Sequence, residues 1–155
     1  MKIRLPSCNK GSITLEFAFG FTTFCIALLA VVEFSRLLFA WSTASEATRV
    51  AARLASICDM SGAQEEVIRN KTLYLVKSSG LFNLNGNSGW LLFTYYPLGC
   101  TSNTCQEVEV RTSGLQAKLN IPGPSLITTI PDFRLRVTRE TMSNTIQNDN
   151  NQACS

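Results

Sequence analysis

The feature that most constrains this chain is an apolar run, Phe17–Val32, that contains no charged residue and lies near the start of the sequence. As a helix, residues 12–32 would span about 30 Å, because each residue adds about 1.5 Å, and this length matches the hydrocarbon thickness of a bilayer. We therefore predict a transmembrane helix over residues 12–36. Glu33 and Arg36 come at its outer end, three residues apart, where their side chains can pair and reach water.

The charges ahead of this run predict the orientation of the helix. Lys2, Arg4 and Lys10 precede it with no acidic residue among them, whereas the whole chain has a net charge of only +3. Basic residues stay on the cytoplasmic side, so we expect a short basic leader over 1–11 in the cytoplasm and an exported domain over 37–155 in the periplasm. No secretory cleavage pattern follows the apolar run, which favours an uncleaved signal anchor as the simplest interpretation.

A helical pattern continues beyond the predicted membrane boundary. Apolar residues recur there at steps of three and four, and many are alanine: Leu37, Trp41, Ala44, Ala47, Ala51, Leu54 and Cys58. This spacing predicts one helix from about residue 12 to about 58, with a narrow stripe on which an exported sheet can pack closely. Trp41 is also close enough to the boundary to serve as an interfacial anchor. The segment DMSG (59–62) should end the helix, with Gly62 as its stop, and a second helix is expected over Ala63–Lys77.

The rest of the chain reads as short strands. WLLFTYYPL (90–98) is typical of a buried strand closed by Pro97, and QEVEVRT (106–112) alternates like a half-exposed strand that would complete a hairpin. IPGPS (121–125) predicts a turn, and DFRLRVTRETM (132–142) alternates again, with its arginines on one face. The predicted fold class is thus α+β, a long N-terminal helix packed against a small antiparallel β-sheet.

Four of the six cysteines lie beyond the apolar run, an even number that favours disulfides in an oxidising compartment. Cys100 and Cys105 enclose the turn-forming tetrapeptide TSNT, so we expect them to pair. Cys58 and Cys154 remain by elimination, and their bond would tie the polar C-terminal tail to a helix end. Zinc is the weaker alternative, because only one close pair of cysteines exists. Cys25, in the apolar run, is expected to be a small packing residue.

Little in the sequence indicates an enzyme or a nucleic-acid-binding protein. The chain has no histidine, which removes the commonest general base and zinc ligand, and it lacks G-x-S-x-G and P-loop motifs. Asp132 and the other scattered acids show no pairing pattern. We therefore predict no catalytic residues, no cofactor and no metal. The arginines of 132–142 alternate with apolar residues, so a solvated face or a subunit contact is expected there rather than a nucleic-acid interface.

Glu16 is the unusual residue at the start of the apolar run. A carboxylate at the centre of a span costs about 2.5–3.5 kcal/mol on insertion scales, and less near an interface. Its side chain could reach the cytoplasmic headgroups one turn away, or it could have a role inside the membrane. The physics of this one residue leaves both interpretations open.

The residues around Glu16 carry a resemblance to a known family. The segment KGSITLEF (10–17) is similar to the processing site of type IV prepilins, and most closely to the TadE-like pseudopilins of tight-adherence (Tad) systems. The likeness continues through VVEFSRLLFAWSTASEATRVAARLA (31–55), with an acidic residue and an arginine at the outer boundary and an Ala-rich helix ending in an AAR motif.

This resemblance implies a specific function. A membrane prepilin peptidase would cut between Gly11 and Ser12 on the cytoplasmic side, and Glu16 would then meet the new amino terminus of a neighbouring subunit. The chain would be a structural minor pilin or pseudopilin of the bacterial inner membrane. Its expected partners are that peptidase, other pilin subunits and the inner-membrane assembly platform. The alternatives are an uncleaved, signal-anchored periplasmic binding module and, with least support, a membrane-anchored enzyme.

Overall fold

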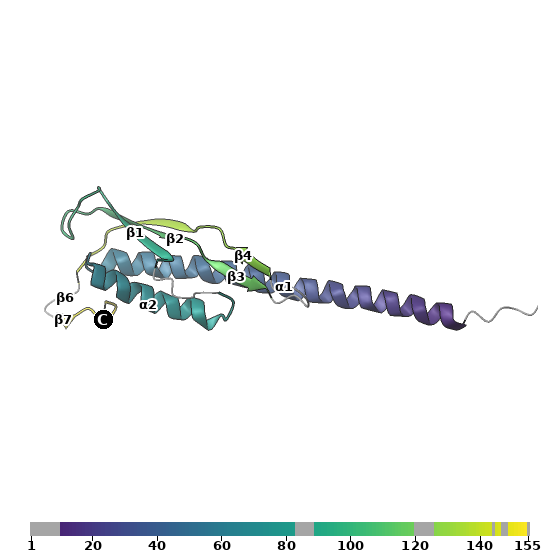
Figure 1. Ribbon diagram of the computed structural model, residues 1–155. Helices are drawn as coiled ribbons and strands as arrows, with labels where there is room; N and C mark the ends of the chain where they lie inside the picture. The colour runs from purple at the N-terminus through teal and green to yellow at the C-terminus, as the bar shows by residue number, and fades with distance from the viewer. Residues whose placement is uncertain (1–9, 83–88, 120–125, 144, 147–148, 155) are drawn as a thin grey trace, which may run out of the picture.

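One helix, α1 (Lys10–Ile57), runs through most of the length of the molecule (Figure 1). The computed structural model describes residues 10–82, 89–119, 126–143, 145–146 and 149–154. The other elements are α2 (Gly62–Ser78), β1 (Leu91–Tyr96), β2 (Glu107–Thr112), β3 (Gln116–Leu119), β4 (Leu126–Thr129), β5 (Arg134–Thr138), β6 (Thr145–Ile146) and β7 (Asp149–Asn150). These elements form an α+β fold with small antiparallel sheets, as the sequence predicts.

The two halves of α1 have different surroundings. The first half projects beyond the rest of the fold, whereas the second half lies between α2 on one side and the strands on the other (Figure 1). The small residues of the second half are almost completely buried: Ala40, Ala44, Ala47, Ala51, Ala52 and Ala55. This stripe lets both layers approach the helix closely. Trp41, predicted to belong to the stripe, is instead 38% exposed beside it, because Ala40 takes the buried position.

The boundary between the helices differs from the prediction. α1 ends at Ile57, and Gly62 is the first residue of α2 rather than the stop of α1. Ser61 supplies the reason, because its extended backbone caps α2 and its hydroxyl accepts a hydrogen bond of 3.2 Å from the backbone N–H of Gln64. From there α2 buries one side, on which Gln64, Ile68, Thr72 and Val76 recur every four residues.

The main sheet has the order β1-β2-β5, and both pairings are antiparallel. Val108 and Val110 of β2 are fully buried against α1. The prediction of a buried strand over 90–98 is wrong in its burial, because β1 is an edge strand with one solvent-facing side, on which Leu92 is 45% exposed. The predicted hairpin between β1 and β2 is present, and β1 ends directly before Pro97.

The sequence pattern did not predict the short hairpin β3–β4 or the pair β6–β7. The β3–β4 hairpin lies at the end of the domain that is nearest the projecting half of α1 (Figure 1). A bridge between Phe82 and Ala117 joins it to the segment that follows α2. The turn expected over 121–125 lies outside the described residues, and β5 occupies the middle of the predicted strand 132–142.

Two disulfides stabilise the domain, Cys58–Cys154 and Cys100–Cys105, with Cα–Cα distances of 5.6 and 5.0 Å. The first joins residues 96 positions apart, at the end of α1 and near the C-terminus. Side chains of α2 hold the same tail: Gln64 donates a hydrogen bond of 2.6 Å to the carbonyl of Cys154, and Lys71 one of 3.0 Å to that of Ala153. The polar tail is therefore attached to both helices.

Candidate functional site at the start of α1

The glycine at the start of α1 has no packing role in the described fold. A Cβ added to Gly11 meets no atom within 4 Å, and the same holds for Gly20 two and a half turns later. Ser12 follows Gly11 on the exposed first turn of the helix. Since the fold would accept a side chain at either glycine, folding does not explain the residue at position 11. Gly20 is a matched position for experiments on Gly11.

The two carboxylates that border the apolar segment have different partners. Glu33 pairs with Arg36, whose Nη1 lies 3.0 Å from the Glu33 Oε1, as the spacing of three predicts. Glu16 is exposed, and within the described part of the chain it forms no ion pair. A carboxylate in this position is therefore available to a cation outside the described chain, whether a lipid headgroup or another subunit.

The projecting half of α1 exposes large apolar side chains all round. Those that are at least half exposed include Ile13, Leu15, Phe17, Phe19, Phe21, Phe24, Ile26, Leu28, Val31, Val32 and Phe34. The hydroxyls of Thr22, Thr23 and Ser35 each donate to the carbonyl four residues earlier, at 2.7, 2.9 and 2.8 Å, which satisfies their polar groups within the helix. A surface of this size and kind is compatible with burial in lipid or among other apolar helices.

A second polar cluster joins α2 to the edge strand β1. Arg69 lies 3.5 Å from Glu65 and donates a hydrogen bond of 3.1 Å to the carbonyl of Leu91, and its guanidinium lies over the ring of Phe93. Burial raises the pKa of Glu65, although Arg69 and a hydrogen bond with Tyr95 oppose the rise. Arg69 thus caps an outward-facing carbonyl of β1 and covers part of an open sheet edge. The spacing of four between Glu65 and Arg69 was the only signal of this cluster in the sequence.

Burial also raises the pKa of Tyr95, and the nearby carboxylates of Glu65 and Asp59 raise it further. Both causes disfavour the phenolate, so the Tyr95 side chain stays a neutral hydrogen-bonding group. Asp59 is itself bound by the hydroxyl of Ser102 in the disulfide loop. The cluster therefore links the end of α1, the start of α2 and the β1–β2 hairpin, and its geometry is that of a structural contact.

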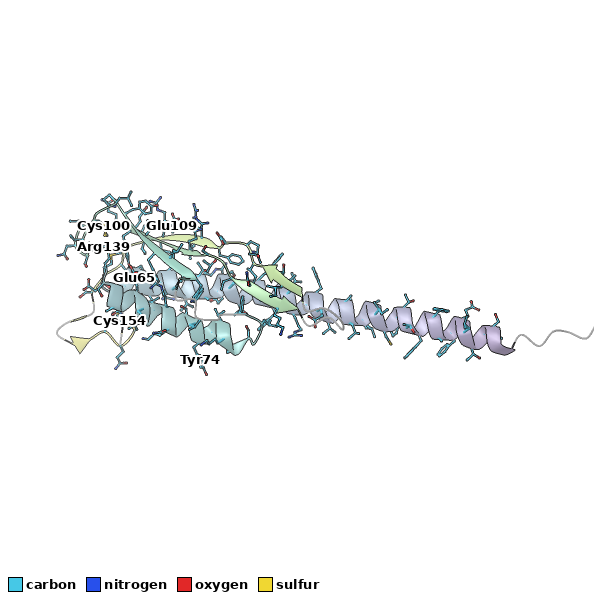
Figure 2. The ribbon with its side chains drawn as sticks, in the orientation of Figure 1. Glu65, Tyr74, Cys100, Glu109, Arg139 and Cys154 are labelled. Carbon is cyan, nitrogen blue, oxygen red and sulfur yellow. A yellow bond between two sulfur atoms is a disulfide. The ribbon has the colours of Figure 1, made fainter. Side chains whose placement is uncertain are left out.

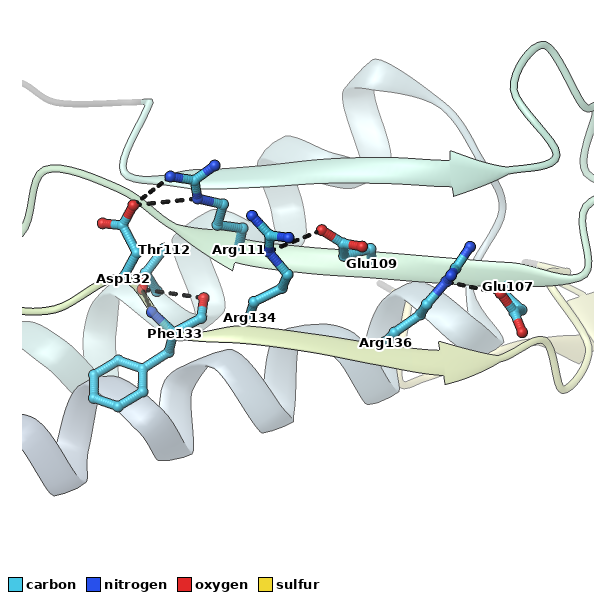
Figure 3. A network of polar contacts seen from close by, with 8 residues as sticks. All are labelled: Glu107, Glu109, Arg111, Thr112, Asp132, Phe133, Arg134 and Arg136. Atoms are coloured by element: carbon cyan, nitrogen blue, oxygen red, sulfur yellow. Dashed lines mark hydrogen bonds and ion pairs between the residues drawn. The ribbon is translucent and has the colours of Figure 1, made fainter.

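The arginines of β5 lie on the outer face of the sheet, as the alternation predicts, and each has an acidic partner (Figure 3). Arg134 lies 3.2 Å from Glu109, and Arg136 lies 2.7 Å from Glu107. Next to them, Arg111 pairs with Asp132 at 2.5 Å. Positive and negative charges alternate across this face, so these arginines form no uncompensated basic surface.

The described residues offer no group of three or more His, Cys, Asp or Glu side chains that could hold a metal ion. The four cysteines beyond the apolar segment are oxidised in pairs, whereas a zinc site would need their thiolates. Cys25 is a free, partly exposed cysteine within the projecting half of α1.

These observations define a class of protein: a disulfide-linked α+β domain built on a helix whose first half is long and apolar enough to cross a membrane once. The arrangement is compatible with single-pass membrane anchoring. Residues 11–53 match the model of the family of TadE-like proteins, which confirms the resemblance seen in the sequence. This family is related to Tad pili and is structural rather than typically enzymatic. No curated protein and no solved structure matches the chain.

The match begins at Gly11 and ends at Arg53, so it covers almost all of α1 and none of the strands. The similarity therefore belongs to the element that combines the apolar segment with the alanine stripe. The domain that packs on this stripe lies outside the match.

Proposed function

We propose that this chain is a minor pilin or pseudopilin of a Tad-type pilus or secretion machine. One observation supports the proposal above all: the family match at 11–53 covers a helix whose first half is exposed and whose second half is packed inside the domain. A pilin needs such a helix, because its apolar half must lie in lipid before assembly and among other apolar helices afterwards.

In this proposal the chain has three parts. Residues 1–11 are a cytoplasmic leader, of which 1–9 lie outside the described residues; 12–36 span the inner membrane; and 37–155 fold in the periplasm. A prepilin peptidase cuts between Gly11 and Ser12, where a residue without a side chain lets the backbone approach the carboxylates of the peptidase. The remaining partners are other pilin subunits and the inner-membrane assembly platform.

Glu16 acts after the cut. The freed amine of Ser12 is cationic near neutral pH, and Glu16 has become the fifth residue of the processed chain. Because the amine lies about 6 Å before Glu16 along the helix axis, the carboxylate meets the amine of a neighbour that is displaced by about one helical turn. An unpaired charge in lipid is costly, so this pairing favours one register between subunits.

The continuity of α1 gives the proposal a mechanical basis. The same helix forms the apolar segment and the centre of the domain core, and it runs without interruption from Lys10 to Ile57. A force on the span therefore moves the domain with it, since no loop separates them. Such rigidity suits a subunit that an assembly platform must lift out of the membrane.

Co-expression with a prepilin peptidase tests the proposal. The membrane form should lose residues 1–11, and its intact mass should give Ser12 as the first residue. Gly11→Val should block the cut, because the added side chain obstructs the backbone at the scissile bond. Gly20→Val is the matched control, as neither position contacts the fold, and it should be processed normally. An unchanged mass in the parent chain would instead support the uncleaved anchor of a periplasmic binding module.

A further inference from the structure

We propose that the membrane-proximal end of the domain docks on phospholipid headgroups, with Lys118 binding phosphate oxygens and Ile127 entering the boundary between headgroups and acyl chains. We call the surface formed by Ser79, Leu81, Lys118 and Ile127 the platform. The proposal rests on the membrane anchoring of α1 that the proposed function includes. It adds a second contact with the bilayer, made by the domain itself.

The platform lies at a definite position along α1. Leu81 and Lys118 line a small cavity together with Glu33, Arg36 and Leu37 of α1. If the hydrocarbon layer ends near Val32, the segment 33–37 extends about 7.5 Å further along the helix. The headgroup layer of one leaflet is about 5–8 Å thick. The platform therefore lies beside α1 at the depth of the headgroups.

Backbone contacts hold the platform in place. The N–H of Lys118 donates a hydrogen bond of 3.0 Å to the carbonyl of Leu81, and Phe82 forms a bridge with Ala117. In the β3–β4 hairpin Lys118 is the direct partner of Ile127, so both side chains leave the same face of the hairpin. Lys118 is exposed, and Ile127 is 56% exposed. A cation beside an exposed branched apolar side chain is the combination that a lipid interface accepts.

The platform is continuous with the exposed apolar surface of α1. A groove of about 430 Å³ lies between Val31, Val32 and Phe39 of α1 and the residues Ser79 and Leu81 of the platform. It thus begins on the last apolar turn of the projecting half and ends on the domain. The large side chains on the following turn, Leu38, Phe39 and Trp41, are also exposed. Lipid that covers the projecting helix would extend into this groove, so we assign phospholipid rather than a protein as its occupant.

Charge favours the phosphate group as the ligand. Arg36 is partly neutralised by Glu33, whereas the described part of the chain places no acidic partner on Lys118. Glu33, Arg36 and Lys118 line the same cavity, so this group of two cations and one carboxylate keeps a net charge of +1 at this depth. One such charge near an anionic membrane surface changes the ratio of docked to undocked domain by about fivefold.

Fluorescence quenching in bilayers tests the proposal with the full chain. Cys25 is replaced by alanine, and Cys8 is replaced as well. The other described cysteines are in disulfides and do not react with a dye. A single cysteine introduced at Ile127, Leu98 or Phe21 then carries an environment-sensitive dye. The bilayers contain phosphatidylethanolamine and phosphatidylglycerol, with a spin label on either the headgroup or the acyl chain. Leu98 is the matched control: it is 79% exposed and lies two residues before Cys100, which is at the end of the domain opposite the projecting half of α1 (Figure 2).

We expect the headgroup label to quench the dye at 127 and not the dye at 98, whereas the acyl-chain label quenches the dye at 21. Lys118→Gln should lower the docked-to-undocked ratio about fivefold in these bilayers. Because Lys118 is exposed, the variant should keep both disulfides, which an intact mass checks.

Two results would overturn the proposal and are distinguishable from failure of the anchor. If the dye at 21 is quenched by the acyl-chain label but the dye at 127 behaves like that at 98, the anchor stands and the docking is wrong. Energy transfer between dyes at 127 on different chains, without headgroup quenching, would assign the groove to a second copy. A dye at 21 that no lipid label quenches would show that the span itself, and with it the proposed function, is wrong.

Discussion

At the scale of single residues, Glu16 differs from the glutamates that form ion pairs within the described part of the chain. Glu33, Glu65, Glu107 and Glu109 each have an arginine partner within the chain. Glu16 forms no such pair within the described residues, although it lies at the start of the apolar segment, where lipid would make an unpaired carboxylate costly. Its role in the proposed function is therefore to bind a group on another molecule.

Glu16→Gln should leave membrane insertion intact and weaken incorporation into the pilus. Removing one partner of a poorly solvated charge pair costs about 3 kcal/mol or more, so incorporation in competition with the parent chain should fall about 100-fold or more. The ratio of the two forms in isolated fibres, measured by mass spectrometry, gives the result. Glu46→Gln is the control, because that exposed side chain lies well outside the apolar segment. Equal incorporation of the Glu16 variant would disprove the charge pairing.

Tyr95 should make the domain sensitive to alkaline pH. Its pKa is raised in the folded state, by burial first and then by the carboxylates of Glu65 and Asp59. The unfolded chain therefore loses this proton at a lower pH than the folded chain does. The stability that the neutral phenol contributes is fully present below pH 10, the ordinary value, and is lost as pH rises above it. Tyr95→Phe should reduce this loss, measured as the denaturation midpoint of the full chain in detergent between pH 8 and about 11.

The same substitution can be followed by absorbance. The chain has three tyrosines, and the raised pKa of Tyr95 predicts that this side chain ionises at a higher pH than an ordinary tyrosine. Loss of the latest phase of the ultraviolet titration in Tyr95→Phe is the expected result. Survival of that phase would assign the raised pKa to another tyrosine.

At the scale of elements, α1 is the centre of the fold and, in the proposed function, also the membrane anchor. Its alanine stripe allows both α2 and the β1-β2-β5 sheet to pack closely against it, and buried side chains from all of these elements form one core. Side chains larger than alanine would separate these layers. The stripe is thus the feature of the helix that fixes the spacing of the domain.

Ala51→Leu should destabilise the domain by about 1–3 kcal/mol, because Ala51 is fully buried and the added methylenes force neighbouring backbones apart. Ala63→Leu adds the same atoms at an exposed position of α2 and should change stability by no more than about 0.5 kcal/mol. Both free energies can be obtained from denaturant unfolding of the full chain in detergent. Similar values for the two variants would show that the stripe tolerates larger side chains.

At the scale of the whole molecule, the two disulfides have different reach. Cys58–Cys154 closes almost the entire part of the chain that follows α1 and attaches the tail to the end of α1, whereas Cys100–Cys105 closes one turn. The long bond therefore restricts the unfolded chain far more than the short one does.

Replacing Cys58 and Cys154 together by serine should cost more stability than replacing Cys100 and Cys105. On the chain-entropy account the two losses are about 4.7 and about 2.2 kcal/mol, for sequence separations of 96 and 5. Thermal unfolding of the full chain in detergent, with and without reductant, measures both. After reduction the variants and the parent chain should converge. A larger loss for the short bond would contradict this assignment.

The elements whose signals are local could be predicted from the sequence. The uncharged run and the spacing of small residues predicted α1 almost to its ends, alternation predicted β2 and β5, and the number and placement of the cysteines predicted both disulfides. At the candidate site, the pattern around Gly11 and Glu16 predicted the family match, while their roles remain predictions. These signals can be recognised in the sequence because each depends on residues only a few positions apart or, for the disulfides, on an even number of cysteines.

The element that covers each face depends on contacts between distant parts of the chain. Periodicity shows that a residue is to be buried, but it does not identify the element that buries it. The sequence pattern therefore did not predict that β1 is a half-exposed edge strand, or that Arg69 of α2 caps the carbonyl of Leu91 in β1. It also did not predict that the short β3–β4 hairpin packs beside α1. Each of these contacts joins residues distant in sequence, and their free energy appears only when the chain has closed the intervening loops. The platform follows from such contacts, and no local pattern in the sequence encodes it.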